Sequence, residues 1–391
     1  MKTNLIHWNK FLVLLVLAVF VGALGCKKQN NKENLTAYLA PQLPDQPYDY
    51  SVNTNRNTKH LQTFNSITAQ IIPINNNIAT LGRVIFYDKM LSINNAIACA
   101  SCHKQEMAFA DGEKFSMGFA NMLTKRNSMA IINPIFSQAM HSGFFWDIRE
   151  TELNMMVIKP VQNHIEMGFD TIANVIAKMK SVPYYANLFQ KAYASNEITV
   201  DKIRESLTQF LLSMVTINSP YDLAAENNFA TFTPQEFRGW EIFSKEGKCL
   251  NCHGGDISNG WVETIANIGL DDKYTDKGIP NVNRIIKNAN ESPSEGYFKI
   301  PSLRNIALTG PYMHDGRFST LDQVVEHYNS GIKNHPDLHW NLRRNGTSLP
   351  IKLNLTQANK AALVAFLKTL TDKNFITDPK FSDPFVGMAL N

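Results

Sequence analysis

Two copies of the pentapeptide Cys-x-x-Cys-His carry the clearest chemistry in the sequence. They are Cys99-Ala-Ser-Cys102-His103 and Cys249-Leu-Asn-Cys252-His253. This spacing is the attachment sequence of c-type haem. The two thiols can add to the vinyl groups of one porphyrin, and the histidine that follows can donate an imidazole nitrogen to the iron. The chain has five cysteines, so only Cys26 lies outside the motifs. We predict two covalently bound haem c groups.

Zinc binding and a redox-active disulfide are the competing interpretations of these cysteines. A zinc site made of two Cys-x-x-Cys pairs usually has the pairs close in sequence, whereas these lie 150 residues apart. A redox-active pair does not need a histidine directly after it. Because the histidine is present in both copies, haem attachment is favoured.

The amino terminus has the features of an export signal. Lys2 and Lys10 accompany an apolar run at residues 11–24, which is shorter than the roughly 18–20 residues that span a bilayer. The run ends in Ala-Leu-Gly-Cys26, which resembles the lipoprotein box of bacteria, where the cysteine is acylated. We expect a signal peptide at residues 1–25 and lipidation of Cys26. The alternative is an ordinary cleaved signal followed by an unrelated cysteine.

Composition and charge limit the classes of partner. Residues 26–60 are mostly polar and rich in Asn, which indicates a flexible tether that holds a periplasmic body near a membrane. The net charge is +4 and falls to +2 without Lys2 and Lys10, which is too small to predict a nucleic-acid partner. No Gly-rich phosphate loop follows a strand-like run, which argues against a nucleotide-dependent enzyme.

The sequence repeats a pattern around the two haem motifs. Gly82-Arg-Val-Ile-Phe86 precedes the first motif and Gly239-Trp-Glu-Ile-Phe243 precedes the second. After each motif the spacing of apolar residues predicts a helix buried on one face. These apolar positions are Ile203, Leu207, Phe210, Leu211 and Met214 in the first copy, and Leu363, Phe366, Leu367 and Leu370 in the second. Since alternating strands are scarce, we predict an all-α fold of two tandem cytochrome c-like haem domains.

The boundary between the domains is expected near residues 218–233, where prolines and an Asn-rich stretch interrupt the helical pattern. Thr233 and Glu236 then form a capping-box pattern, with a proline at the first helical position. We place the N-terminal haem domain at residues 61–225 and the C-terminal haem domain at residues 226–391.

Further motifs follow one another in order between residues 65 and 384. They are Leu81-Gly82-Arg-Val-Ile-Phe-Tyr-Asp88, Arg126-Asn127-Ser, Phe145-Trp146-Asp147-x-Arg149, Pro160 followed by Glu166-Met167-Gly168, Pro301-Ser-Leu-Arg304-Asn305, Thr309-Gly-Pro311-Tyr-Met-His314-Asp315-Gly316, and Phe366-Leu-Lys-Thr-Leu. Together with the haem motifs they resemble the bacterial dihaem cytochrome c peroxidases and their relative MauG. The resemblance implies that electrons enter at the C-terminal haem and that peroxide reacts at the N-terminal haem.

In this family the N-terminal haem, here held by His103, is the peroxidatic one. Typical peroxidases have a second histidine that binds this iron until the enzyme is reduced, and this chain has Phe119 at that position. A phenyl ring cannot ligate iron, so we expect an open coordination position that needs no reductive activation. His141 or His164 is an alternative ligand, although each is more simply explained as a surface or loop residue.

Glu166 aligns with the acid–base residue of the family. A carboxylate in a dry pocket has a raised pKa and can move protons as the O–O bond breaks. A helix cap or a solvent-facing side chain is the alternative role. Met156 stands where the family often has a glutamine, which removes a hydrogen-bonding neighbour and adds an oxidisable thioether.

The resemblance also assigns Trp146 to the path between the two haems, although a tryptophan of this kind can equally be a core residue. Ile148 replaces a glycine of the family two residues later, which could alter the local turn. Asn127, Thr309 and Pro311 match positions that bind a calcium ion through oxygen atoms, which suit a hard cation. We therefore expect one calcium ion as a further cofactor.

The second haem iron is expected to be bound by His253 on one side and by Tyr328 on the other, as in MauG, where the peroxidases have a methionine. A phenolate stabilises oxidised iron and lowers its potential, which disfavours electron uptake from an ordinary cytochrome. The alternative is a packed tyrosine beside a true ligand at His327. His314 is expected to make structural or inter-haem polar contacts.

These inferences lead to three hypotheses. The first is a peroxidase that reduces hydrogen peroxide with electrons from a periplasmic donor such as cytochrome c. The second is a MauG-like enzyme that stores oxidising equivalents and oxidises a protein partner. The third is a lipid-anchored electron-transfer cytochrome without catalysis. A homodimer is possible in each, and no nucleic-acid partner is expected.

Overall fold

The computed structural model describes residues 40–52, 73–140, 142–255, 257, 264–279 and 295–385. They belong to one unit, Ala40–Asn391. The predicted signal peptide, Cys26 and His141 lie outside the described residues. Within these ranges no helix is long and apolar enough to cross a membrane.

The described chain is mostly helical, as predicted. Its first half contains α3 (Asn76–Tyr87), α4 (Cys99–Cys102), α5 (Pro134–Ala139), α6 (Leu153–Met156), α7 (Ile172–Lys180), α8 (Pro183–Tyr193) and α9 (Val200–Leu212), with 3-10 turns η2 (Lys89–Leu91) and η3 (Gln105–Met107). Its second half contains α10 (Pro220–Glu226), α11 (Pro234–Glu241), π-helix η4 (Ile242–Glu246), α12 (Leu250–His253), 3-10 turn η5 (Ile306–Leu308), α14 (Leu321–Glu326), π-helix η6 (His327–Gly331), 3-10 turn η7 (Trp340–Leu342), α15 (Gln357–Lys368) and 3-10 turn η8 (Pro379–Phe381). A small antiparallel sheet pairs β1 (Ile265–Ala266) with β2 (Phe298–Lys299).

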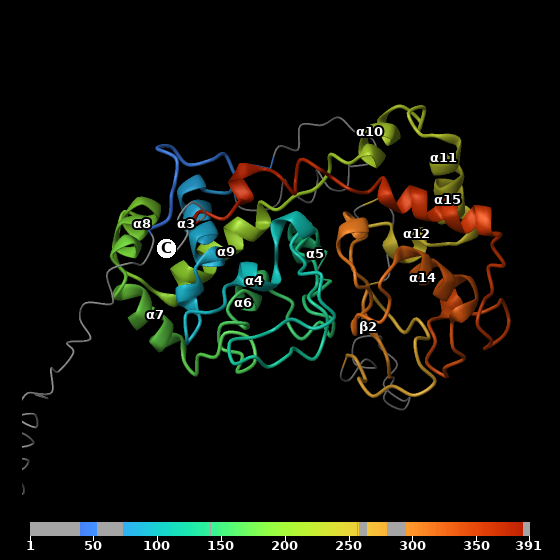
Figure 1. Cartoon of the computed structure of the whole chain (residues 1–391), viewed down its shortest axis with the longest axis horizontal. Coiled ribbons are helices and arrows are strands. Elements are labelled where there is room, and N and C mark those ends of the chain that lie inside the picture. The colour runs from blue at the N-terminus through green and yellow to red at the C-terminus, as the bar shows by residue number, and fades with distance from the viewer. Residues whose placement is uncertain are drawn as a thin grey trace, which may run out of the picture. The chain divides into compact units, whose positions relative to one another are not determined.

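The same close helix crossing occurs twice, between α3 and α9 and between α11 and α15 (Figure 1). A Cβ atom at Gly82 in α3 would lie 1.9 Å from the carbonyl oxygen of Ser206 in α9. A Cβ atom at Gly239 in α11 would lie 2.0 Å from the carbonyl oxygen of Ala362 in α15. The repeated glycine of the sequence is therefore the point where two backbones touch, because any side chain would push the helices apart.

The two predicted amphipathic helices are present as α9 and α15, but each is slightly shorter than expected. They end at Leu212 and Lys368, so Met214 and Leu370 lie just beyond them and are nonetheless fully buried. An apolar residue can continue a helical spacing in the turn after the helix, which sequence periodicity does not distinguish from the helix itself.

The predicted start of α11 is confirmed, whereas the stretch before it differs from expectation. Thr233 caps α11 and exchanges hydrogen bonds with Glu236 in a capping box, with a proline at the first helical position. The region expected to interrupt helical structure contains α10, because Pro220 occupies the first position of a helix that Ser219 caps. Tyr221 of α10 packs in the same core cluster as α11 and α15.

Segments from both ends of the described chain pack against α3 and α9. Tyr50, from the segment expected to be a flexible tether, is fully buried and donates a hydrogen bond to the carbonyl of Lys380 at 3.1 Å. Phe381 of η8 lies edge-on to Phe109 and Phe210. The tether therefore becomes part of the folded body near Tyr50, and the end of the chain returns to the helices around the first haem motif.

Candidate functional site

The first haem motif occupies the short helix α4 and the residue after it. The hydroxyl of Ser101 accepts a hydrogen bond from the backbone N–H of Ala98 at 3.0 Å, which closes the start of the helix. Nδ1 of His103 lies 2.7 Å from the carbonyl oxygen of Phe109. This bond places the proton on Nδ1, so Nε2 is the ring nitrogen that can act as a metal ligand.

The second haem motif has the same arrangement at α12. The π-helix η4 leads into it, and the backbone N–H of Cys249 donates to the carbonyl of Phe243 at 3.1 Å. Nδ1 of His253 lies 3.1 Å from the carbonyl oxygen of Pro301. Each histidine is therefore oriented by a backbone carbonyl, which is the support that ligating imidazoles usually have.

Both motifs line one continuous cavity of about 1110 Å³. An ordinary ligand pocket measures roughly 300–1,000 Å³, so this cavity is at least as large as the pockets that hold a cofactor. None of the four motif cysteines forms a disulfide in the described chain. Burial raises the pKa of Cys99 and of Cys249 to about 12, so both thiols lie in apolar surroundings within the cavity wall. The paired thiols, the oriented imidazoles and the size of the cavity fit two haem c groups.

Glu166 lies in the wall of this cavity, on the loop after α6. Its Oε1 atom accepts a hydrogen bond from Nδ2 of Asn163 at 2.8 Å. Burial raises the pKa of Glu166, and the nearby charge of Arg149 partly opposes that shift. Glu166 also lines a second, smaller pocket of about 280 Å³ with Arg149 and Lys159. The carboxyl group therefore stands between the main cavity and a polar pocket beside it.

Asn163 was not singled out from the sequence. An asparagine three residues before a glutamate carries no distinctive signal, and only the fold shows that its amide holds the carboxylate.

Neither Phe119 nor His164 is among the residues that line the cavity. The ring of Phe119 packs against Gly168, where a Cβ atom would be only 2.5 Å from the ring. His164 is exposed, with 79% of its side-chain surface accessible and Asp170 3.9 Å away. Met156 does line the cavity, so the thioether that replaces the glutamine of the family faces the same space as Glu166.

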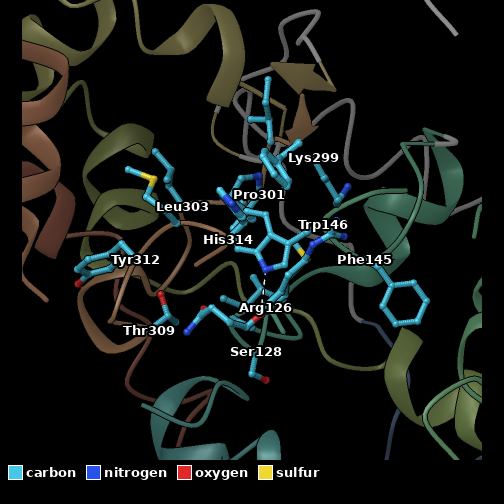
Figure 2. A pocket seen from close by; sticks show the side chains of 18 of the residues that line it. Arg126, Ser128, Phe145, Trp146, Lys299, Pro301, Leu303, Thr309, Tyr312 and His314 are labelled. Atoms are coloured by element: carbon cyan, nitrogen blue, oxygen red, sulfur yellow. Dashed lines mark hydrogen bonds between the residues drawn. The ribbon is translucent and has the colours of Figure 1, made fainter. Parts of the chain in front are cut away.

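Trp146 lines the cavity together with Arg126 and His314 (Figure 2). Its indole Nε1 donates a hydrogen bond to the carbonyl of Asn127 at 2.9 Å. The backbone N–H of Asn127 in turn donates to the carbonyl of His314 at 2.8 Å. The imidazole of His314 stacks on Phe298 of β2, with ring centroids 3.7 Å apart. These bonds hold Trp146 between segments that belong to the two halves of the chain.

Arg126 is a residue whose role the sequence did not reveal, although its motif was noted. Its guanidinium forms a two-pronged ion pair with Asp276 at 2.6 and 2.8 Å and a further ion pair with Asp147 at 2.7 Å. Because Asp147 directly follows Trp146, this cluster fixes the loop that carries the indole. The sequence alone does not pair Arg126 with Asp276, because the two residues are 150 positions apart.

Ile148 stands in the same loop with an unusual backbone. Its φ angle is 44°, a left-handed conformation that is costly for a β-branched residue. Its side chain packs against the cluster of Ile265 and Ile279. Ile148 therefore adopts a left-handed conformation at a backbone cost that its apolar contacts help to offset.

Tyr328 and His327 follow each other in the π-helix η6 and face different ways. Tyr328 lines the cavity, and burial raises the pKa of its phenol. His327 is buried and its Nε2 lies 3.0 Å from the carbonyl oxygen of Ile268. A π-helix is often found at a functional site because it re-aims one side chain. The phenol of Tyr328 is therefore available to the cavity, whereas the imidazole of His327 is already engaged.

The three residues expected to bind calcium all line the cavity. Nδ2 of Asn127 donates to the carbonyl of Glu113 at 2.8 Å, which leaves its Oδ1 atom as an acceptor. A cis peptide bond joins Gly310 to Pro311, and Thr309 directly precedes Gly310. No cluster of three or more His, Cys, Asp or Glu side chains suited to a metal is found in the described part of the chain.

The comparison with known proteins identifies the family. A model of the di-haem cytochrome c peroxidase family matches residues 76–229. The cytochrome c551 peroxidase of Nitrosomonas europaea is 31% identical over 326 residues, which cover 82% of this chain and 86% of that protein. The chain belongs to the di-haem cytochrome c peroxidase family. It is therefore an oxidoreductase of the peroxidase type, in a family that carries two haem c groups.

Other relatives of this peroxidase point to MauG. The methylamine utilization protein MauG of Methylophilus methylotrophus is 27% identical over 299 residues, 75% of this chain and 82% of that protein. The solved structure of a MauG-like protein associated with microbial copper homeostasis is 33% identical. It superposes with a TM-score of 0.67 and covers 80% of this chain and 94% of that one.

Proposed function

We propose that this protein reduces hydrogen peroxide to water with electrons from a periplasmic one-electron donor such as cytochrome c. The observation that carries the proposal is one cavity that is lined by both haem motifs and by Glu166. Neither Phe119 nor His164 lines this cavity. Each motif would hold one haem in a tandem cytochrome c-like unit, with His103 and His253 as the proximal ligands. The repeated glycine crossings support this duplication.

A haem held by His103 would supply the iron at which peroxide reacts. Glu166 would take a proton from the incoming peroxide and return it to the departing oxygen, because a buried carboxyl with a raised pKa can both accept and donate a proton. Asn163 orients the carboxylate through its hydrogen bond to Oε1. Two electrons and two protons then convert one hydrogen peroxide molecule to two water molecules.

Trp146 would carry electrons between the two haem motifs. Its indole lines the cavity and is held by Asn127, so both its position and its orientation are fixed. A calcium ion bound by Oδ1 of Asn127 and the carbonyl oxygens of Thr309 and Pro311 would stabilise the same region. Export through the signal at residues 1–25 and lipidation of Cys26 complete the proposal.

A second candidate function is favoured by Tyr328. The phenol lines the cavity while His327 is engaged with a backbone carbonyl, which supports Tyr328 as the second ligand at the His253 haem. A hard anionic ligand stabilises oxidised iron. The protein would then retain oxidising equivalents and pass them to a protein partner, as the relationship to MauG suggests. A simple electron-transfer cytochrome is the weaker reading, because such a protein needs no carboxylate in its cavity.

Stopped-flow spectroscopy separates these functions. The diferric holoprotein is mixed with hydrogen peroxide, and reduced cytochrome c is added afterwards. Rapid oxidation of the cytochrome supports the peroxidase. A long-lived oxidised state with slow cytochrome oxidation supports the MauG-like enzyme, and no reaction with peroxide leaves only the electron-transfer cytochrome.

A further inference from the structure

A buried carboxylate, Asp88, binds two phenols near the first haem motif. Asp88 ends the sequence motif that begins at Leu81, and it has no part in the proposed peroxidase reaction. It is only 4% exposed. Its Oδ1 atom accepts a hydrogen bond from the backbone N–H of Met90 at 2.8 Å. Its Oδ2 atom accepts one from the hydroxyl of Tyr184 and one from the hydroxyl of Tyr185, both at 2.6 Å. Distances this short are typical of hydroxyl groups that donate to a carboxylate.

The two tyrosines lie in the first turn of α8, close to the first haem motif. Helix α8 packs against α3, and α3 also contacts α4, which carries that motif (Figure 1). Tyr185 is fully buried, whereas Tyr184 is partly exposed, and their rings are 4.8 Å apart between centroids. Burial raises the pKa of Tyr185 well above its ordinary value, and the charge of Asp88 adds to the shift. The pKa of Tyr185 also responds to a charge on Cys99, so this phenol lies near the first haem attachment site.

Two other buried tyrosines in the same half of the chain have acceptors of a different kind. The hydroxyl of Tyr50 donates to the carbonyl of Lys380 at 3.1 Å, and the hydroxyl of Tyr87 donates to the carbonyl of Phe381 at 2.6 Å. A backbone carbonyl accepts a hydrogen bond but does not take up the proton, whereas a carboxylate can do both. The hydroxyl groups on Asp88 are therefore the ones with a base at hydrogen-bonding distance.

A phenol bonded to a base can give up an electron more easily than one without a base. The oxidised phenol is a strong acid, so the loss of its electron requires a neighbour that accepts the hydroxyl proton. Such a base must lie within roughly 2.6–3.2 Å of the donor atom, and Asp88 meets this condition for both tyrosines. The proton then stays inside the cluster, and the tyrosyl radical that remains is neutral.

We propose that Tyr184 and Tyr185 form a redox-active pair, with Asp88 as its proton acceptor, that takes up one oxidising equivalent from the first haem motif when no donor protein is present. In this step the O–H bond of one tyrosine breaks and its proton binds to Oδ2 of Asp88. The electron supplies one of the two that convert hydrogen peroxide and two protons to two waters, so hydrogen peroxide is the oxidant. This inference rests on the proposed peroxidase function and adds the place where an unused oxidising equivalent is held.

Electron paramagnetic resonance of the holoprotein, frozen shortly after mixing with hydrogen peroxide and without a donor, tests the pair. The samples are the unaltered protein, the same protein containing ring-deuterated tyrosine, the double variant Tyr184→Phe/Tyr185→Phe, and Asp88→Asn. Tyr87→Phe is the matched control, because the hydroxyl of Tyr87 also makes a 2.6 Å hydrogen bond, but to a backbone carbonyl.

We expect a radical signal from the unaltered protein that narrows when the tyrosine rings are deuterated, because the coupling to the ring protons is then lost. The double variant should lose this signal. Asp88→Asn should lose it as well, because an amide can accept the two hydrogen bonds but cannot take up a proton. Tyr87→Phe should keep the signal.

Spin trapping in the unaltered protein gives a second measurement that does not depend on how the variants fold. Trypsin cleaves after Lys180 and Lys191, and the peptide between them contains Tyr184 and Tyr185 as its only tyrosines. A nitroso spin trap added with peroxide should therefore leave its adduct on the peptide of residues 181–191, identified by mass spectrometry. Adducts found only on other peptides overturn the redox-active pair.

The outcomes separate failure of the redox-active pair from failure of the peroxidase function. A signal that ring deuteration does not change, or one that persists in the double variant, overturns the pair. A signal that persists in Asp88→Asn overturns the carboxylate as the proton acceptor. The absence of a radical, although the visible spectrum shows that peroxide has reacted, also overturns the pair. A visible spectrum that peroxide leaves unchanged contradicts the proposed function instead.

Discussion

Replacing Glu166 by Gln tests the acid–base role with a minimal change of shape. A glutamine side chain has the same length, and its Oε1 can still accept the hydrogen bond that Asn163 donates at 2.8 Å. It cannot gain or lose a proton. General acid–base catalysis contributes typically 100- to 10,000-fold, so we expect kcat/KM for peroxide to fall by about that factor, or about 3–5 kcal/mol of transition-state stabilisation.

The pH dependence of the same variant gives a second, independent signature. Burial raises the pKa of Glu166 above the ordinary value of about 4.3, so the carboxylate needed as a base is lost at a higher pH than for an exposed glutamate. In the unaltered protein, kcat/KM should therefore fall as the pH drops through this raised pKa. The Glu166→Gln variant should lack that limb of the profile.

Stability separates a catalytic role from a structural one. A carboxyl whose pKa is raised in the folded state binds its proton more tightly when folded, so its contribution to stability is present below the unfolded pKa and lost as pH rises through the folded pKa. At pH 7 the neutral glutamine avoids this cost, so Glu166→Gln should unfold at the same temperature as the unaltered protein or higher.

Stopped-flow measurement of peroxide reaction from pH 4 to 8, with thermal unfolding on the same samples, provides the assay. Glu152→Gln is the control, because Glu152 is exposed and bonds only to the amide of Gln138 among the side chains described. A Glu166→Gln variant whose kcat/KM stays within about threefold of the unaltered protein, or whose profile keeps the acidic limb, refutes the reasoning.

Three further predictions follow from the packing and the cavity. Gly82→Ala should lower the free energy of unfolding by about 1–3 kcal/mol, because the new Cβ would lie 1.9 Å from the carbonyl oxygen of Ser206. An unchanged midpoint of chemical denaturation would contradict the close helix crossing. Tyr328→Met should raise the reduction potential of one haem and speed oxidation of reduced cytochrome c, and identical redox titrations of both proteins would count against Tyr328 as a ligand. Removing calcium with a chelator should slow electron transfer between the haems, and adding calcium back should restore the rate. The Asn127→Ala variant should be insensitive to the chelator. A chelator effect that persists in Asn127→Ala would place the ion elsewhere.

The sequence predicted the features that depend on residue type at fixed spacing. The haem motifs, the capping box at Thr233 and the repeated glycines are of this kind, because each needs a particular side chain, or none, at a particular position. The role of Gly82 as a backbone contact was beyond the sequence, since its partner in α9 lies more than 120 residues away.

Other features of the site leave no trace in residue types. The orientation of His103 and His253 depends on the carbonyls of Phe109 and Pro301, and every residue has a carbonyl. The packing of Tyr50 against the end of the chain could not be predicted either, because the segment around it is polar and lacks helical periodicity. Composition alone favoured a tether there.

The central claim is that the iron held by His103 has one coordination position that no side chain fills. Electron paramagnetic resonance of the resting ferric holoprotein, with a cyanide titration followed in the visible spectrum, tests this most directly. We predict a high-spin signal from one haem and the binding of one cyanide per chain to it. Two low-spin haems that bind no cyanide would contradict the claim and the peroxidase function with it.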